Sequence, residues 1–110
     1  MSAEELLIQD YFANNAKFTD DQFIRRFRMS RALFLKIVTD LESKYDFFSK
    51  LLFDARMQKS FTALQKCTSA IRQLAYGNTA DALDEYLNMS ERVSRRIFAQ
   101  ANIQRYSTFV

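Results

Sequence analysis

Three arginines and two carboxamides near the end of the chain have the chemistry for binding a polyanion. Arg92, Arg95 and Arg96 carry guanidinium groups, whose planar fork can bind the O6 and N7 atoms of guanine with two hydrogen bonds. Gln100 and Asn102 carry amides that can pair with adenine. At about 100° per residue, these five side chains fall within roughly half of a helix circumference. We therefore expect one polar helix face able to contact double-stranded DNA.

The other half of that helix is apolar and would hold the arginine face outward. Its residues are Val93, Ile97, Phe98 and Ala101. Ser90 can cap the start of the helix, which we expect to reach about Gln104. Arginines on the solvated face of a packed helix are also common, so an ordinary surface stays open as the alternative.

A second group of arginines lies in the segment RRFRMSR and consists of Arg25, Arg26, Arg28 and Arg31. Basic clusters of this size attract polyanions, so the segment could be a second phosphate contact or a nuclear import signal. Phe27 and Met29 interrupt the run. The alternative is a set of solvated arginines that border a buried aromatic side chain.

An aromatic run within residues 44–60 offers a different chemistry. If Phe47, Phe48 and Phe53 are not all buried, they form an apolar patch suited to a protein partner.

Residue content argues against catalysis. The chain has no histidine and one cysteine, which excludes the usual zinc sites and the Ser-His and Cys-His nucleophile systems. The acidic groups, Asp20 with Asp21 and the set Asp81, Asp84 and Glu85, are better explained as favourable charge in the first turns of helices. We expect no cofactor or metal and a buried thiol at Cys67, as in a reducing compartment.

The elements that must position the carboxyl-terminal arginines form a predicted three-helix unit. Residues 61–76 have one apolar face, opposite to Gln65, Ser69, Arg72 and Gln73. Thr62 with Gln65 predicts a capping box, and Gly77, the only glycine, predicts a left-handed stop. Asn78 or Thr79 can then cap a short helix over 80–87, and Asn88 with Met89 would form the turn to the arginine helix. A basic helix after a short helix and a tight turn is typical of a helix-turn-helix.

The first half of the chain predicts supporting helices. Ser2 with Glu5 and Thr19 with Gln22 mark two helix starts, of which the first helix runs to about Asn14. The second helix would bury Phe23, Ile24 and Phe27. Ser30 begins a long helix with an apolar stripe, namely Leu33, Phe34, Ile37, Val38, Leu41 and Tyr45.

Composition agrees with an all-α domain of five to seven helices. The chain has 110 residues, no proline, one glycine, 48% hydrophobic content and 11 phenylalanines. We expect a single domain over 1–110, with supporting helices in 1–60 and the helix-turn-helix in 61–105. No stretch of about 20 apolar residues or secretory signal occurs, so we expect no membrane partner and a nuclear or cytoplasmic location.

Charge is uneven along the chain. It is −4 over residues 1–21, +5 over 22–59, −1 over 60–89 and +3 over 90–110. If three or four arginines of the last helix met phosphates, the binding constant would fall with salt at a logarithmic slope near −3. Such binding is weak, so we expect help from a homodimer or a partner.

Three segments carry a resemblance to a known family. They are DYFANN (residues 10–15), FTDDQFIRRFRMSRALFLKIVTDLE (18–42) and LQKCTSAIRQLAYGNTADALDEYLNMSE (64–91). Together they resemble the N-terminal helical region of plant PIF/Harbinger transposase-derived proteins, and the similarity spans roughly residues 10–98.

The resemblance implies a transposase-derived helical head that binds DNA and partner proteins. In that family a DDE-type nuclease domain follows, but no residue of this chain matches its catalytic aspartates, so we expect no enzyme activity. The resemblance also implies an alternative function, a protein-interaction adaptor that binds a Myb-like or chromatin partner. The tail from Ala99 to Val110 departs from the family pattern.

Overall fold

The described part of the chain is helical throughout, apart from short connections. The computed structural model describes residues 2–44, 61–77, 84–87, 89–101 and 103–109, and no strand occurs among them. Six α-helices lie in these ranges: α1 (Ala3–Leu7), α2 (Asp20–Phe27), α3 (Arg31–Lys44), α5 (Ala63–Tyr76), α6 (Asp84–Leu87) and α7 (Glu91–Ala101). A π-helical segment (Ile8–Phe12) extends α1, and a 3₁₀ segment (Ile103–Phe109) lies beyond α7. The prediction of an all-α fold with a trihelical carboxyl-terminal part is confirmed.

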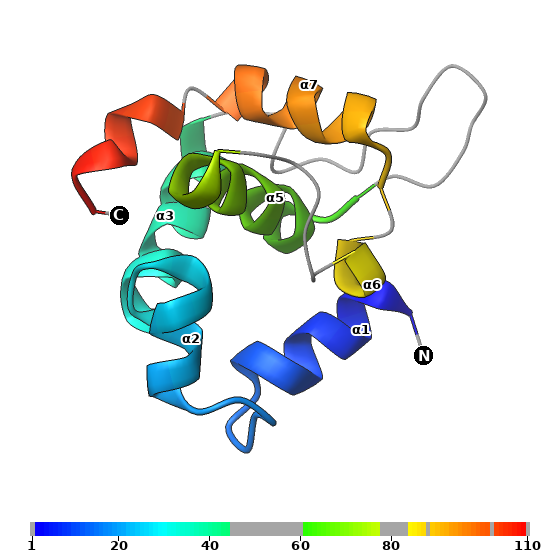
Figure 1. The fold of residues 1–110 in the computed structure, drawn as a ribbon, viewed down its shortest axis with the longest axis vertical. Coiled ribbons are helices and arrows are strands. Elements are labelled where there is room, and N and C mark those ends of the chain that lie inside the picture. Colours follow the sequence, from blue (N-terminus) through cyan, green and yellow to red (C-terminus); the bar gives the residue numbers. More distant parts are fainter. Residues whose placement is uncertain (1, 45–60, 78–83, 88, 102, 110) are drawn as a thin grey trace.

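Helix α5 occupies the centre of the molecule. It contacts α2, α3, α6, α7 and the 3₁₀ segment, and Figure 1 shows it enclosed between α7 on one side and α2 and α3 on the other. Seven consecutive residues, Gln65 to Ile71, are buried, so the polar face predicted for this helix is covered as well as the apolar one. Polar side chains on it hydrogen-bond neighbouring helices instead of water. Gln65 Nε2 donates to the carbonyl of Tyr86 at 3.1 Å, and Gln73 Nε2 donates to that of Ser94 at 2.8 Å.

The predicted helix starts are confirmed by their caps. Complete capping boxes, in which side chain and backbone bond reciprocally, begin α2 at Thr19 and α5 at Thr62. Three serine hydroxyls accept a backbone N–H three residues onward, at the starts of α1, α3 and α7: Ser2, Ser30 and Ser90. The predicted caps at Asn78 and Thr79 lie outside the described residues.

Two helices end on a left-handed residue. Gly77 ends α5 with φ 78°, as predicted, and its N–H donates to the carbonyl of Gln73. Helix α2 ends on Arg28 with φ 57°, which the sequence analysis did not anticipate. The carbonyls in the last turn of α2 accept hydrogen bonds from α5: the Tyr76 hydroxyl donates to the carbonyl of Arg25, and Arg72 Nη1 to that of Arg26. Helix α5 therefore caps α2.

The core of the supporting helices is aromatic. Tyr11, Phe23, Phe27 and Phe34 are fully buried, and their rings meet edge-on or stacked at centroid distances of 4.4 to 6.2 Å. Such contacts add stability beyond that of the area they bury. The prediction that α2 also buries Ile24 is wrong, because this side chain is 45% exposed at the edge of the apolar stripe.

The first helix ends earlier than predicted. Its last turn widens into the π-helical segment and stops at Phe12 rather than Asn14. This segment buries Asp10, whose carboxylate accepts a hydrogen bond from the Tyr86 hydroxyl of α6 at 2.6 Å. The amino-terminal helix is thereby joined to the carboxyl-terminal half, and the two lie side by side in Figure 1.

The last helix also ends earlier than predicted, at Ala101 rather than near Gln104, and the 3₁₀ segment follows from Ile103. Asp40 of α3 fixes this segment: its carboxylate accepts hydrogen bonds from the Tyr106 hydroxyl and, at 3.0 Å, from Arg105 Nη2. Lys44 Nζ lies 3.1 Å from the other oxygen. The segment after α7 is therefore held by a tertiary contact with α3 that no local sequence pattern indicated.

Candidate nucleic-acid interface

Helix α7 presents the predicted polar face to solvent. Arg92, Arg95, Arg96 and Gln100 are all exposed, while Asn102 lies outside the described residues. The opposite face is held against the core: Ser94, Ile97 and Ala101 are buried, and Val93 and Phe98 are partly buried. The outer position of α7 is visible in Figure 1.

One of the three arginines is paired within its own helix. Arg95 donates from Nη2 and Nε to Glu91 Oε1, at 2.6 and 3.1 Å. Both side chains are largely exposed, at 69% and 64%, so the pair is worth only a few tenths of a kcal/mol, about 0.3–0.5 for this spacing. This pair was not predicted above, although a glutamate four residues before an arginine is a known helix pairing.

Arg92 and Arg96 make no ion pair or side-chain hydrogen bond within the described residues. With Gln100 they form a stripe at i, i+4 and i+8. At 1.5 Å per residue the stripe is about 12 Å long, the length of three to four base pairs. It presents two cations and one amide without a carboxylate partner.

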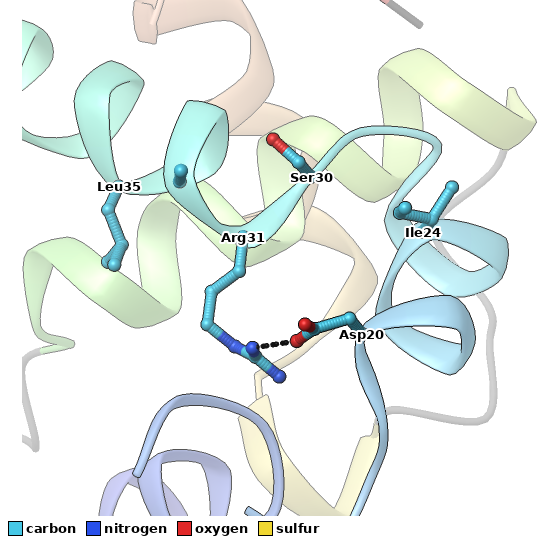
Figure 2. Close-up of a pocket in the computed structure, with 6 residues that line it drawn as sticks. Asp20, Ile24, Ser30, Arg31 and Leu35 are labelled. Carbon is cyan, nitrogen blue, oxygen red and sulfur yellow. Dashed lines mark hydrogen bonds and ion pairs between the residues drawn. The ribbon is translucent and has the colours of Figure 1, made fainter. Parts of the chain in front are cut away.

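The structure separates Arg31 from the other arginines of the second group. Its guanidinium forms an ion pair with Asp20, and its Nε donates to the carbonyl of Tyr11 at 2.7 Å. Figure 2 shows this pair beside a surface depression of about 500 Å³ between α2 and α3, where Ile24 and Leu35 also lie. Arg31 therefore has a role in holding the fold.

The other three members of that group lie on α2 and at its end. Arg25 and Arg28 are exposed, and Arg26 is half-buried. The guanidinium of Arg28 lies 4.7 Å from the ring centre of Tyr76, and that of Arg26 lies 4.7 Å from the ring centre of Phe18. Arg26 and Arg28 thus border aromatic rings, and no carboxylate pairs with any of the three arginines among the described residues.

Two ionisable side chains of α5 are buried. Cys67 is fully buried, and burial raises the pKa of its thiol well above the usual value. Lys66 is 3% exposed, and burial lowers the pKa of its ammonium group. The predicted burial of Cys67 is confirmed, whereas no feature of the sequence pointed to Lys66.

The structure gives no contacts for the remaining predicted site residues. Phe47, Phe48, Phe53 and Asp81 lie outside the described residues. Within the ranges that are described, no group of three His, Cys, Asp or Glu side chains could hold a metal ion. No helix there is long and apolar enough to cross a bilayer.

Comparison with known proteins gives one partial match. Residues 4–42, from α1 to near the end of α3, match a domain of unknown function (DUF8418). No curated protein matches the chain, and no solved structure does. The matched domain carries no stated activity, so the resemblance to PIF/Harbinger transposase-derived proteins stays a prediction.

Proposed function

We propose that this protein binds double-stranded DNA through the exposed face of α7, without catalysing a reaction on it. The resemblance to the N-terminal region of PIF/Harbinger transposase-derived proteins suggested this function. It implies a transposase-derived DNA-binding module that acts in the nucleus.

The observation that carries the proposal is the stripe of Arg92, Arg96 and Gln100. Guanidinium groups bind phosphates and guanine edges strongly when no carboxylate competes for them. The two arginines meet that condition within the described residues, and the buried face of α7 fixes the direction in which they point. The trihelical setting of α5, α6 and α7 further supports a helix-turn-helix docking mode.

The proposal predicts the salt dependence of DNA binding. Each phosphate neutralised by a cation contributes about −0.9 to the slope of log K against log salt. Arg96→Gln should therefore make the slope shallower by about 0.9, and the double variant Arg92→Gln, Arg96→Gln by about 1.8. Fluorescence anisotropy of a labelled duplex, titrated between roughly 50 and 200 mM salt, measures both values.

Lys36→Gln is the matched control, since Lys36 is also an exposed helix cation without an ion pair among the described residues. It removes the same charge from a different face and should leave the slope unchanged. Circular dichroism should be the same for all four proteins, because the substituted side chains are exposed. If the double variant keeps the wild-type slope, α7 is not the DNA contact.

The alternative function, a protein-interaction adaptor with a Myb-like or chromatin partner, depends on Phe47, Phe48 and Phe53. These residues lie outside the described part, so no contact in the structure favours this alternative. A pull-down that needs the three phenylalanines but tolerates loss of Arg92 and Arg96 would favour it over DNA binding.

A further inference from the structure

A second cationic surface is assembled from segments that are far apart in the sequence. The chain before α2, the second half of α2 and the last turns of α5 meet there. We call it the α2–α5 cationic surface and define it by Lys17, Arg25, Arg26, Arg28 and Arg72. Three of these five residues, Arg25, Arg26 and Arg28, belong to the arginine group predicted from the sequence. The fold adds Lys17 and Arg72 to them. Arg31 is left out because it pairs with Asp20.

Tyr76 organises one half of this surface. The guanidinium of Arg28 lies 4.7 Å from the centre of its ring, and that of Arg72 lies 4.5 Å away. The hydroxyl of Tyr76 and Nη1 of Arg72 both donate to carbonyls at the end of α2, which fixes α5 against that helix. Two cations from different helices are thus held around one aromatic side chain.

Phe18 organises the other half in the same way. Arg26 lies 4.7 Å and Lys17 5.3 Å from the centre of its ring. Cation–π contacts of this kind stabilise a cation over the face of a ring. They hold the positive charges in place but do not neutralise them.

Four of the five cations of this surface have no carboxylate partner among the described residues. Within the described residues, Lys17, Arg25, Arg26 and Arg28 form no ion pair, in contrast to Arg31 and Arg95. Asp21 lies one helical turn before Arg25 and is exposed, but it forms no ion pair with Arg25 or with any other described residue. Neighbouring like charges repel one another, and an anion bound among them would relieve that repulsion.

We propose that the α2–α5 cationic surface is a second contact for the phosphates of duplex DNA, beside α7. This inference rests on the proposed function. Phosphate is the expected ligand rather than a base, because cations already lie against the Tyr76 and Phe18 rings and occupy the positions on which a base would stack. Guanidinium forks suit the oxygens of phosphate well.

The two surfaces are connected through the last turns of α5. Gln73 donates to the carbonyl of Ser94 in α7, and Tyr76, three residues onward, donates to the end of α2. Packed helices have axes about 8–10 Å apart, and α2 and α7 both pack on α5, so the axes of α2 and α7 are at most about 16–20 Å apart. One helical turn of DNA is about 34 Å long, so a duplex is long enough to reach from one surface to the other. Contact with both surfaces would strengthen binding by a single copy of the chain.

The test uses the full chain and a labelled duplex of about 20 base pairs, as in the anisotropy titration above. Arg25→Gln removes an exposed cation whose side chain holds no other part of the described structure. We expect it to make the salt slope shallower by about 0.9, and Arg25→Gln with Arg28→Gln by about 1.8, with affinity lowered several-fold at low salt. Lys36→Gln is the matched control, and Arg25→Lys should restore the wild-type slope because it keeps the charge.

Failure of this inference differs from failure of the proposed function. If Arg25→Gln and the double variant behave like Lys36→Gln while Arg92→Gln, Arg96→Gln loses binding, the second contact is wrong and α7 alone binds DNA. If the α2 variants lose binding and the α7 variant does not, the second contact holds and the role of α7 is wrong. A wild-type chain that shows no salt-dependent DNA binding overturns both. Thermal unfolding of Arg28→Gln checks that the end of α2 is intact. If this variant is destabilised, the salt slope of Arg25→Gln alone tests the second contact.

Discussion

At the scale of single residues, some cations of this protein pair with a carboxylate, and others have no carboxylate partner among the described residues. Lys44 and Arg105 are the clearest examples of the first kind, since both pair with Asp40, which also accepts a hydrogen bond from the Tyr106 hydroxyl. The hydrogen bond from Tyr106, followed by those from Lys44 and Arg105, lowers the pKa of Asp40 from 3.8 to about 2. The ionised carboxylate is therefore the form that the folded state favours.

This shift predicts how stability depends on pH. Because the folded pKa of Asp40 lies below the unfolded value, its stabilising effect is fully present above about pH 4 and is lost as the pH falls towards 2. Asp40→Asn should lower the melting temperature near neutral pH, and the difference from wild type should disappear by about pH 2. Thermal unfolding followed by circular dichroism at several pH values measures it.

Glu42→Gln is a suitable control for that experiment. Glu42 lies on the same helix, is exposed and makes no ion pair among the described residues, so its substitution should not reproduce the pH-dependent difference. A gap between wild type and Asp40→Asn that stays constant from pH 7 to pH 2 would contradict the role given to the carboxylate.

The exposure of the α7 arginines was predictable, but contacts between different helices were not. The 100° period correctly placed Arg92, Arg95 and Arg96 on the outer face of α7. The partner of Arg31 is 11 residues away on another helix, and the ring that Arg28 faces is 48 residues away. Such contacts depend on how helices meet, and helical periodicity carries no information about that.

At the scale of elements, the helix starts follow from the sequence because caps act locally. Thr19, Ser30, Thr62 and Ser90 each bond a backbone group three residues onward, so their effect needs no tertiary contact. Gly77 likewise ends α5 by its own conformational freedom. The left-handed Arg28 was missed because arginine, unlike glycine, gives no sequence signal for that conformation; its N–H donates to the carbonyl of Ile24 within the same turn.

Gly77→Ala tests the local part of this explanation. A side chain in the left-handed region costs about 1–2 kcal/mol, and no atom lies within 4 Å of the position that the new Cβ would take. The free energy of unfolding should therefore fall by about 1–2 kcal/mol from backbone strain alone. Urea denaturation measures the change.

Gly77→Asn separates strain from crowding, since asparagine adopts the left-handed conformation more readily than alanine. It should lose less stability than Gly77→Ala although its side chain is larger. The opposite order would mean that space, rather than backbone conformation, requires glycine at this position.

At the scale of the whole molecule, α5 is the element whose environment the sequence described least well. Its apolar stripe predicted one buried face, yet residues 65–71 are buried all around the helix. The polar side chains opposite the stripe bond to α2, α6 and α7, which no local pattern could show. The same limit explains why Ile24 was predicted as buried. Helical periodicity identifies the apolar face of α2, but it does not show how much of that face the neighbouring helices cover.

The central position of α5 predicts that residues 61–110 do not fold alone. Without α2 and α3, the buried side of α5 around Cys67 and Ile71 would face water, and isolated helices of this length are marginal. Circular dichroism of the fragment should show little helix, and addition of a 1–60 fragment should restore it. A cooperative thermal transition of the 61–110 fragment by itself would refute this prediction.

The hydrogen bonds from Arg72 and Tyr76 to the end of α2 have a consequence for evolution. They bind to backbone carbonyls, so the sequence of α2 can vary at Arg25 and Arg26 without loss of these two bonds. The two bonds depend on the backbone position of the end of α2 and on the two donor side chains, Arg72 and Tyr76. A recombinant chimera that joined this α5 to a longer or shorter α2 would lose these two hydrogen bonds at the end of α2, so a change in the length of α2 calls for a matching change in α5.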